Sequence, residues 1–399
     1  MIIQILFALL LGLTAGTFTG LFPGIHINLV ALLLFLSSGF LLQFTTPEVL
    51  VVFIVAMAIA HIFLDFIPSI FLGAPEESTA LSVLPGHSLL LEGKGYEAIR
   101  LTTFGSYVGL IIMILITPLF VIFLNPVYQF LQNYIAYILI LASLFLILKE
   151  DKKVLALVVF LLAGVLGIAT LNFQVIKEPL FPLLTGLFGT SMLLISISEK
   201  TKIPKQIISK SSVDKKESLK IFSASIISGS ICSFMPGLGA SQAAVLGSDI
   251  CGKIDRKGFL ILLGAISTIV TGLNFIALYA INKPRSGTAI IIGKILNVLN
   301  LQTLLLILIT ALIAGSISVF ITLYSAKKFS RFIERVNYQK LCLIVSVILV
   351  LMSILISGLW SIPILIVATS LGILTNLLGI RKMHLMGCLI VPVIIYFII

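Results

Sequence analysis

Long apolar runs, separated by short breaks of polar residues, glycine and proline, follow one another along the whole chain. A helix needs about 20 apolar residues to cross roughly 30 Å of hydrocarbon, and most runs have about that length. The pattern predicts an all-α polytopic membrane protein with about 12–14 transmembrane segments, including broken or re-entrant helices. The expected segments are 2–21, 27–43, 48–72, 97–124, 127–148, 154–173, 180–197, 219–235, 238–250, 258–281, 301–325, 341–358, 361–379 and 383–399.

The composition supports a membrane location. Apolar residues make up 59% of the chain, only 10% are charged, and the mean hydropathy is +1.23. A soluble protein of 399 residues could not bury so much apolar surface, so we expect a multi-pass protein of the cell membrane. The net charge of +11 resides in short loops between apolar runs, so nucleic-acid binding is not expected. The cysteines lack C-x-x-C spacing, and we expect neither a metal site nor a cofactor.

Glycines recur at every fourth position of the first apolar run, as Gly12, Gly16, Gly20 and Gly24. This spacing places them on one face of a helix, where they permit close packing against another helix in lipid. The run also lacks a basic leader and a clear cleavage site. We therefore expect it to remain as a helix rather than to be removed as a signal peptide.

The basic residues predict the topology. Loops rich in lysine and arginine lie at 92–100, 149–153, 199–220, 251–257, 326–340 and 381–382, and the connections near 45, 125, 177 and 360 are nearly neutral. The positive-inside rule places the basic loops in the cytoplasm and the neutral connections opposite them. Both termini are then extracytoplasmic. Each half has an odd number of expected segments, so the second half enters the membrane with the opposite orientation.

Two pairs of segments indicate an internal repeat. "GTFTGLFPGIHIN" (16–28) aligns without gaps with "GSICSFMPGLGAS" (229–241), and "LDFIPSIFLGAPEESTA" (64–80) aligns with "LNFIALYAINKPRSGTA" (273–289). Asp65 falls on Asn274, and Glu76 falls on Arg285. We expect two inverted-topology repeats, 1–197 and 219–399, joined by a basic cytoplasmic linker at 198–218. The alternative is chance similarity between apolar segments.

Four breaks near residues 23, 75, 236 and 284 lie at corresponding positions of the two halves. Broken helices in such positions are typical of the substrate site of a secondary transporter, and their exposed N-termini favour an anion. The candidate substrate-binding residues are Pro23, Gly24, His26, Asn28, Ser78, Thr79, Gly237, Gly239, Ser241, Gln242, Asn274, Lys283, Arg285, Ser286 and Thr288.

Arg285 and Lys283 are the candidate cations for a bound anion. A guanidinium can hold a carboxylate through two parallel hydrogen bonds, and the lysine adds a point charge. Alternatively, both cations lie among lipid headgroups at the end of a span.

His61, Asp65, Glu76 and Glu77 are the candidates for ion coupling. Carboxylates within a membrane cost several kcal/mol unless they are paired, protonated or bound to a cation, which suits H⁺ or Na⁺ coupling. His61 and Asp65 lie one helical turn apart, so they can form a proton relay or a purely structural pair. The glutamates can instead pair with Arg285 or lie in a surface turn.

At these breaks and in the block "GAPEESTALSVLPGHSLLLEGKGYEAIRLTTFGS", the chain resembles the large permease subunit of tripartite tricarboxylate transporters, the TctA-type family, and its compact archaeal branch in particular. "PLFPLLTGLFG" (179–189), "MPGLGASQAA" (235–244), "NKPRSGTA" (282–289) and "RKMHLMGCLIVPVIIYF" (381–397) carry the same resemblance. It implies a secondary active permease for small carboxylates. In bacterial systems of this kind, a small membrane subunit and an extracytoplasmic binding protein assist the permease.

The expected function is transport of a small organic anion, a di- or tricarboxylate, coupled to a Na⁺ or H⁺ gradient. The competing hypothesis is an intramembrane enzyme or flippase that acts on a lipid or a lipid-linked sugar. The chain contains no H-E-x-x-H, D-D-x-x-D or G-x-S-x-G motif, so we do not expect an enzyme.

Overall fold

The computed structural model describes residues 2–22, 27–73, 79–198, 203–208, 215–234, 239–252, 254–284, 286–296 and 298–398. Throughout these ranges the regular structure is helical, and eight helices there are long and apolar enough to cross a membrane. The prediction of an all-α polytopic membrane protein is confirmed.

The first half of the chain contains ten α-helices within the described residues. They are α1 (Ile2–Leu21), α2 (Ile27–Leu36), α3 (Ser38–Leu41), α4 (Pro47–Leu64), α5 (Val83–Leu91), α6 (Gly95–Leu131), α7 (Ile135–Leu148), α8 (Lys153–Leu171), α9 (Leu180–Leu184) and α10 (Ser191–Ser198). A π-helical turn, Pro68–Leu72, extends α4, and a second one, Thr185–Thr190, joins α9 to α10. Short 3₁₀ turns span Ala80–Ser82 and Gln132–Tyr134.

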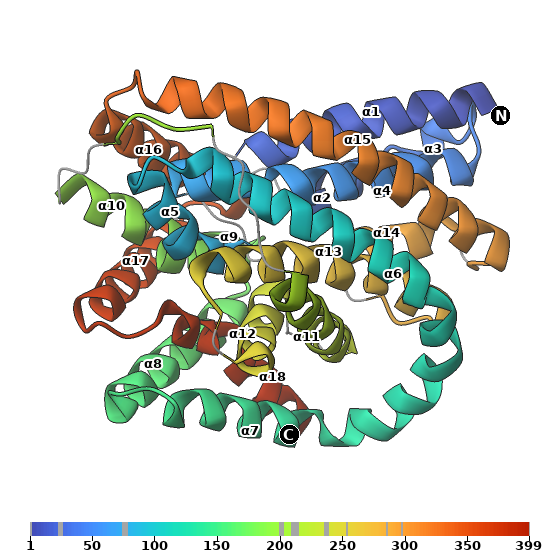
Figure 1. The fold of residues 1–399 in the computed structure, drawn as a ribbon. Helices are drawn as coiled ribbons and strands as arrows, with labels where there is room; N and C mark the ends of the chain where they lie inside the picture. Colours follow the sequence, from blue (N-terminus) through green and yellow to red (C-terminus); the bar gives the residue numbers. More distant parts are fainter. Residues whose placement is uncertain are drawn as a thin grey trace.

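The second half follows a similar order of long and short helices. It contains α11 (Lys215–Phe234), α12 (Ala240–Cys251), α13 (Arg256–Ile281), α14 (Gly287–Leu296), α15 (Leu301–Ile333), α16 (Tyr338–Ser357), α17 (Ser361–Leu377) and α18 (Gly387–Ile398), the last preceded by the 3₁₀ segment Lys382–Met386. Figure 1 shows α1 and α15 along the upper edge, α7 and α8 along the lower edge, and α13 between them.

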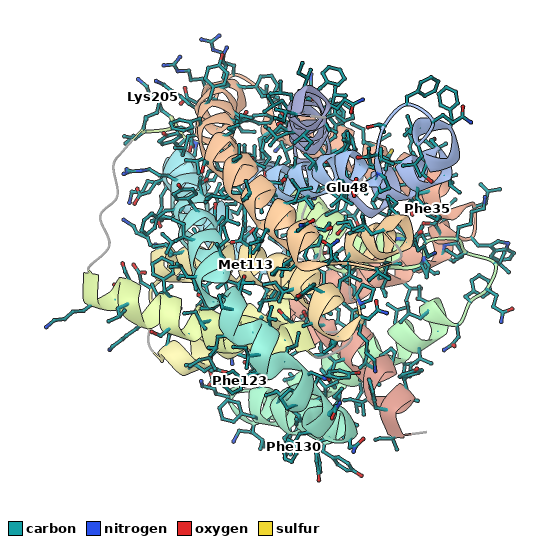
Figure 2. The ribbon with its side chains drawn as sticks, turned by 90° about the vertical axis from the view of Figure 1, so that its right-hand side faces the viewer. Phe35, Glu48, Met113, Phe123, Phe130 and Lys205 are labelled. Atoms are coloured by element: carbon teal, nitrogen blue, oxygen red, sulfur yellow. The ribbon has the colours of Figure 1, made fainter. Side chains whose placement is uncertain are left out.

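Two expected segment ends are wrong. The segment expected at 301–325 continues to Ile333 as α15. We predicted a break between two segments near residue 125, but α6 continues for 37 residues through Pro118 and Pro126. Proline removes one backbone donor, and a membrane helix tolerates this loss where neighbouring groups take up the freed carbonyl. The ribbon of α6 curves at its C-terminal end toward α7 (Figure 1). In Figure 2, α6 passes from the buried Met113 in the middle of the molecule to the exposed Phe123 and Phe130 at its lower margin.

Two helices form the centre of the molecule. In the most apolar window of Pro47–Leu72, which is α4 with its π-helical extension, 94% of the residues are buried, and the value for α13 is 89%. The central helix α4 packs against α1 and α15, and α13 packs against α11 and α6. Since α15 belongs to the second half and α6 to the first, each half supplies a helix that covers the central helix of the other.

The glycine face of the first helix packs closely, as predicted. A Cβ atom at Gly12 would lie 2.5 Å from the carbonyl oxygen of Phe53, and one at Gly20 would lie 2.9 Å from that of His61. Gly16 faces Met57 in the same way. These glycines let α1 lie against the backbone of α4, while Gly24 is outside the described residues.

Basic loops from distant parts of the sequence contact one another. Arg256 forms an ion pair with Glu92 at 2.7 Å, and Arg381 forms one with Glu150. The Lys152 ammonium donates a hydrogen bond to the Leu378 carbonyl at 2.8 Å. These contacts gather the loops that the positive-inside rule assigns to one side.

Contacts also link the connections that were assigned to the opposite side. Gln4 donates a hydrogen bond to the Phe44 carbonyl at 3.2 Å, and Ser357 donates one to the Glu178 carbonyl at 2.8 Å. None of these five contacts joins a basic loop to a neutral connection, and which group of loops faces the cytoplasm stays a prediction.

Candidate functional site

Two buried, titratable side chains lie at the end of α4. His61 and Asp65 occupy successive turns of a helix whose other buried residues are almost all apolar. His61 Nδ1 lies 3.0 Å from the Thr19 hydroxyl, which belongs to the last turn of α1. The break near residue 23 lies four residues after Thr19. This contact therefore places His61 beside the helix that leads into that break.

The π-helical turn after Asp65 connects the same region to the second break. The Ser69 hydroxyl lies 2.8 Å from the Asp65 carbonyl oxygen and 2.6 Å from the Thr79 hydroxyl. Thr79 is fully buried, and its carbonyl accepts a hydrogen bond from the Ser82 hydroxyl at 2.7 Å. Ser69 thus links the helix before residues 74–78 to the chain after them. Single π-helical turns inside α-helices often occur at functional sites.

The breaks near residues 75 and 284, here called the hairpin-like breaks, begin with the same backbone conformation. Gly73 and Asn282, which are equivalent in the alignment of the halves, have φ angles of 63° and 50°. Within the described ranges, Asn282 is the only residue other than glycine with a positive φ. Glycine and asparagine adopt this left-handed conformation at low cost, and it ends a helix. Both central helices therefore stop at corresponding positions.

The second hairpin-like break leads into α14. The Ser286 hydroxyl accepts a hydrogen bond from the Ala289 amide at 3.2 Å and lies 3.2 Å from the Thr288 hydroxyl. Asn274, the counterpart of Asp65, is buried on α13. The second half therefore places neutral polar groups where the first half has a carboxylate.

The breaks near residues 23 and 236 each contain a Pro-Gly pair and are here called the Pro-Gly breaks. The second of them precedes α12 in the sequence. Gln242 Oε1 accepts a hydrogen bond from the Gly239 amide at 2.8 Å, and Ser241 beside it is fully buried. Gln242 Nε2 donates to the Met386 sulfur at 3.4 Å. This contact brings the N-terminal turn of α12 against the 3₁₀ segment Lys382–Met386.

Lys283 lies at the surface. Its Nζ is 3.3 Å from the Tyr128 hydroxyl and 4.7 Å from the centre of that ring. This placement matches the alternative in which the cation lies at the end of a span, and a role in binding stays a prediction.

Several candidate residues lie outside the described residues. They are Pro23, Gly24, His26, Glu76, Glu77, Ser78, Gly237 and Arg285, together with the side chain of Asn28. The predicted roles of these residues, including a pairing of either glutamate with Arg285, are untested.

A family comparison covers almost the whole chain. The model of the tripartite tricarboxylate transporter TctA family matches residues 6–387. The chain belongs to this family. It is also 33% identical over 398 residues to the uncharacterized protein MJ1079 of Methanocaldococcus jannaschii, with 98% of each chain covered. No solved structure matches it.

Family membership and the apolar helices identify this TctA-family chain as a multi-pass membrane protein of a transport family. Sequence reasoning missed two hydroxyls of the site, Thr19 and Ser69. Isolated serines and threonines within apolar runs are common, so neither residue stood out. Their positions on the helices that flank two breaks were the available signal.

Sequence reasoning also missed a polar cluster around Glu150. The His384 imidazole lies 3.0 Å from the Glu150 carboxylate, which also pairs with Arg381. His384 is not among the predicted site residues, yet it is buried. The available signal was a pair of acidic residues, Glu150 and Asp151, within the otherwise basic loop 149–153.

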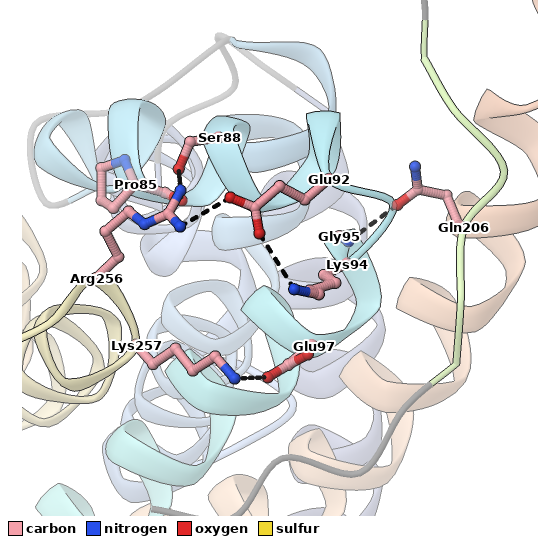
Figure 3. Close-up of polar contacts among 9 residues, drawn as sticks. All are labelled: Pro85, Ser88, Glu92, Lys94, Gly95, Glu97, Gln206, Arg256 and Lys257. Atoms are coloured by element: carbon pink, nitrogen blue, oxygen red, sulfur yellow. Dashed lines mark hydrogen bonds and ion pairs between the residues drawn. The ribbon is translucent and has the colours of Figure 1, made fainter.

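A second polar network joins α5, α6 and α13 on the side of the basic loops (Figure 3). Arg256 contacts Glu92 and donates to the Ser88 hydroxyl at 2.8 Å, while Lys257 pairs with Glu97 at 2.6 Å. Hydrogen bonds from Arg256 and Lys94 hold the pKa of Glu92 below its ordinary value of 4.5. The network fixes the start of α6 to the start of α13.

Proposed function

We propose that this protein is a secondary active transporter that carries a small organic anion, a di- or tricarboxylate, across the cell membrane with H⁺ or Na⁺. The observation that carries the proposal is the set of buried polar groups on the central helices beside the chain breaks. Ionisable groups within a membrane protein are costly and usually serve transport or proton transfer. Membership of a tricarboxylate transporter family supports the choice of substrate class.

The two halves differ in a way that suits ion coupling by the first. In the alignment, Thr19 corresponds to Cys232 and Ser69 to Leu278. When the second aligned stretch is continued three residues toward the N-terminus, His61 corresponds to Val270. Cys232 and Val270 are both buried in one apolar cluster. The first half therefore places titratable and hydroxyl groups where the second half has mostly apolar ones. A proton or Na⁺ would bind on the α4 side, with His61 and Asp65 as its ligands.

The anion would bind near the starts of α12 and α14. The backbone amides at a helix N-terminus attract negative charge, and Ser241, Gln242, Ser286 and Thr288 add neutral donors there. Arg285 and Lys283 remain the proposed cations of the α14 side.

Inverted repeats would provide the two access states. The central helix of the first half, α4, packs against α1 of its own half and α15 of the other half. In the same way, α13 packs against α11 of its own half and α6 of the other half. We propose that the repeats are 1–197 and 219–399, with both termini extracytoplasmic. If the two repeats exchanged these two similar packing arrangements, a central site would open to one side of the membrane and then to the other.

The family name also suggests partners. We propose that a small membrane subunit and an extracytoplasmic binding protein assist this chain. Transport by the purified chain alone would show that neither partner is obligatory.

Uptake into proteoliposomes tests the proposal. Labelled citrate, succinate and malate would be offered under an inward H⁺ gradient, an inward Na⁺ gradient or neither. We expect accumulation of at least one of these acids only with a gradient, and collapse of that gradient by an ionophore should release it. Failure of every acid to accumulate under both gradients, here and in membrane vesicles from cells that also hold the proposed partners, would contradict the proposal.

A further inference from the structure

Lys382 is a buried cation that the proposed coupling and binding residues do not include. It starts the 3₁₀ segment that precedes α18, and only 5% of its surface is exposed. The neighbouring Arg381 has a side chain that is 51% exposed and is paired with Glu150. Two adjacent basic residues therefore have opposite environments, and the buried one is the unusual case.

The nearby carboxylate is already occupied. Glu150 binds both Arg381 and the His384 imidazole, which follows Lys382 by two residues. Among the described residues, Lys382 Nζ reaches a single polar atom, the Ser191 hydroxyl oxygen at 3.5 Å. That hydroxyl donates its own hydrogen to the Leu187 carbonyl at 2.7 Å, so its oxygen is turned to accept from the ammonium.

Within the described part of the chain, this buried ammonium contacts no carboxylate, and such burial is costly. Buried charges are normally paired, and a lone charge in a low-dielectric interior costs several kcal/mol. A protein retains such a group where a mobile anion supplies the missing charge during function. Lysine suits this task because its ammonium is a compact point charge with three donors.

The segment that carries Lys382 contacts a hydroxyl of the first half and a helix N-terminus of the second. Ser191 directly follows the π-helical turn Thr185–Thr190. Met386, four residues after Lys382, contacts Gln242 in the first turn of α12. The 3₁₀ segment therefore lies between a helix irregularity of the first half and a helix N-terminus of the second. The α12 N-terminus favours negative charge independently of the lysine.

We propose that Lys382, with Ser191 and the start of α12, binds one carboxylate group of the transported anion. This inference rests on the proposed function and adds to it a cation on the segment that contacts the first turn of α12. The cations proposed above, Lys283 and Arg285, precede α14 instead.

Thermal unfolding of the purified protein in nanodiscs tests the inference without requiring transport. Sodium citrate, succinate and malate are the probes, with sodium chloride at equal ionic strength as the reference. A ligand that binds only the folded state raises the melting temperature in proportion to its affinity. Wild type should be stabilised by at least one of these carboxylates. In Lys382→Gln and Lys382→Met, the apparent affinity for it should fall by at least about 30-fold.

The variants' own stability separates binding from structure. Because the substitutions remove a buried charge that pairs with no carboxylate of the described residues, their melting temperatures without ligand should equal or exceed that of wild type. The matched control is Lys152→Gln, which removes an exposed ammonium from the same side of the molecule and should keep wild-type affinity.

Undiminished carboxylate binding by both Lys382 variants would overturn the inference while leaving the proposed function intact. Absence of binding by wild type would overturn it as well. Carboxylate binding that depends on Lys382 in a protein without gradient-driven uptake would support the inference and contradict the proposed function instead.

Discussion

At the residue scale, the distinguishing feature is a short series of hydroxyl and titratable groups around α4. Thr19 contacts His61, and Ser69 connects the turn after Asp65 to Thr79. Each contact joins a side chain of the central helix to a segment next to a chain break. Protonation or Na⁺ binding in this region would therefore act directly on the elements that flank the breaks.

Ser69→Ala should impair transport more than it impairs folding. The substitution removes the two buried contacts of the Ser69 hydroxyl, with the Asp65 carbonyl and with the Thr79 hydroxyl. Each buried hydrogen bond contributes roughly 0.5–1.5 kcal/mol to stability, and loss of the second contact separates Thr79 from the π-helical turn. We expect a small drop in melting temperature and a clear drop in the uptake rate at saturating substrate. Ser370→Ala is the matched control, because Ser370 is exposed and its hydroxyl donates only to Ile366 within α17. Equal uptake by both variants would argue against a role for Ser69.

The ion pair between Arg256 and Glu92 should make a pH-dependent contribution to stability. The lowered pKa of Glu92 means that this contribution is complete above the ordinary value of 4.5 and is lost as the pH falls through the lowered value. Wild type should therefore be more stable than Glu92→Gln at pH 7, and the difference in melting temperature should vanish in strong acid. The pH dependence of transport near neutrality should be the same in both proteins, and a change in Glu92→Gln would contradict this assignment.

At the element scale, small residues determine how closely the helices approach. Gly12, Gly16 and Gly20 bring α1 against the backbone of α4, and Gly105, Gly109 and Gly264 do the same for α6 and α13. The Thr268 hydroxyl donates to the Ser106 carbonyl at 2.8 Å across the latter contact. These two interfaces keep both central helices buried, although packing in lipid lacks the hydrophobic driving force that operates in water.

Gly16→Val should destabilise the protein strongly. The new side chain would overlap the Met57 carbonyl and Ala60, and overpacking of a tight contact costs roughly 1–3 kcal/mol or more. Size-exclusion chromatography and thermal unfolding should reveal aggregation or a lowered melting temperature. Gly39→Val is the control, because nothing lies within 4 Å of a Cβ at that position. Equal stability of the two variants would show that α1 and α4 are not in close contact.

The helices were largely predictable from the sequence, because the length of an apolar run reflects the thickness of the bilayer. The prediction that a helix ends near residue 125 was wrong, because a proline can lie within a membrane helix whose neighbours satisfy the freed carbonyl. The site was less predictable. His61 and Asp65 stood out as ionisable groups in an apolar run, whereas Lys382 resembled an ordinary loop cation until its burial was visible.

At the scale of the whole molecule, the two halves of the sequence are interleaved. α6 packs on α13, α15 packs on α4, and α8 packs on α18. One of the apolar clusters combines residues from both halves, among them Leu139, Phe160, Leu187, Ala368 and Cys388. A movement of one half as a rigid body would break these contacts. We therefore expect the moving units to combine helices from both halves.

The central claim is that the first half couples the ion and the second half contributes to anion binding. Asp65→Asn gives the first half the residue that the second half has at the equivalent position, Asn274, and removes the proposed coupling charge while keeping a similar shape. The most direct test compares gradient-driven accumulation with counterflow, in which internal unlabelled acid exchanges for external labelled acid, in wild-type and Asp65→Asn proteoliposomes. The account predicts that the variant loses accumulation and keeps counterflow. Accumulation at the wild-type level, with the same response to the H⁺ or Na⁺ gradient, would contradict it.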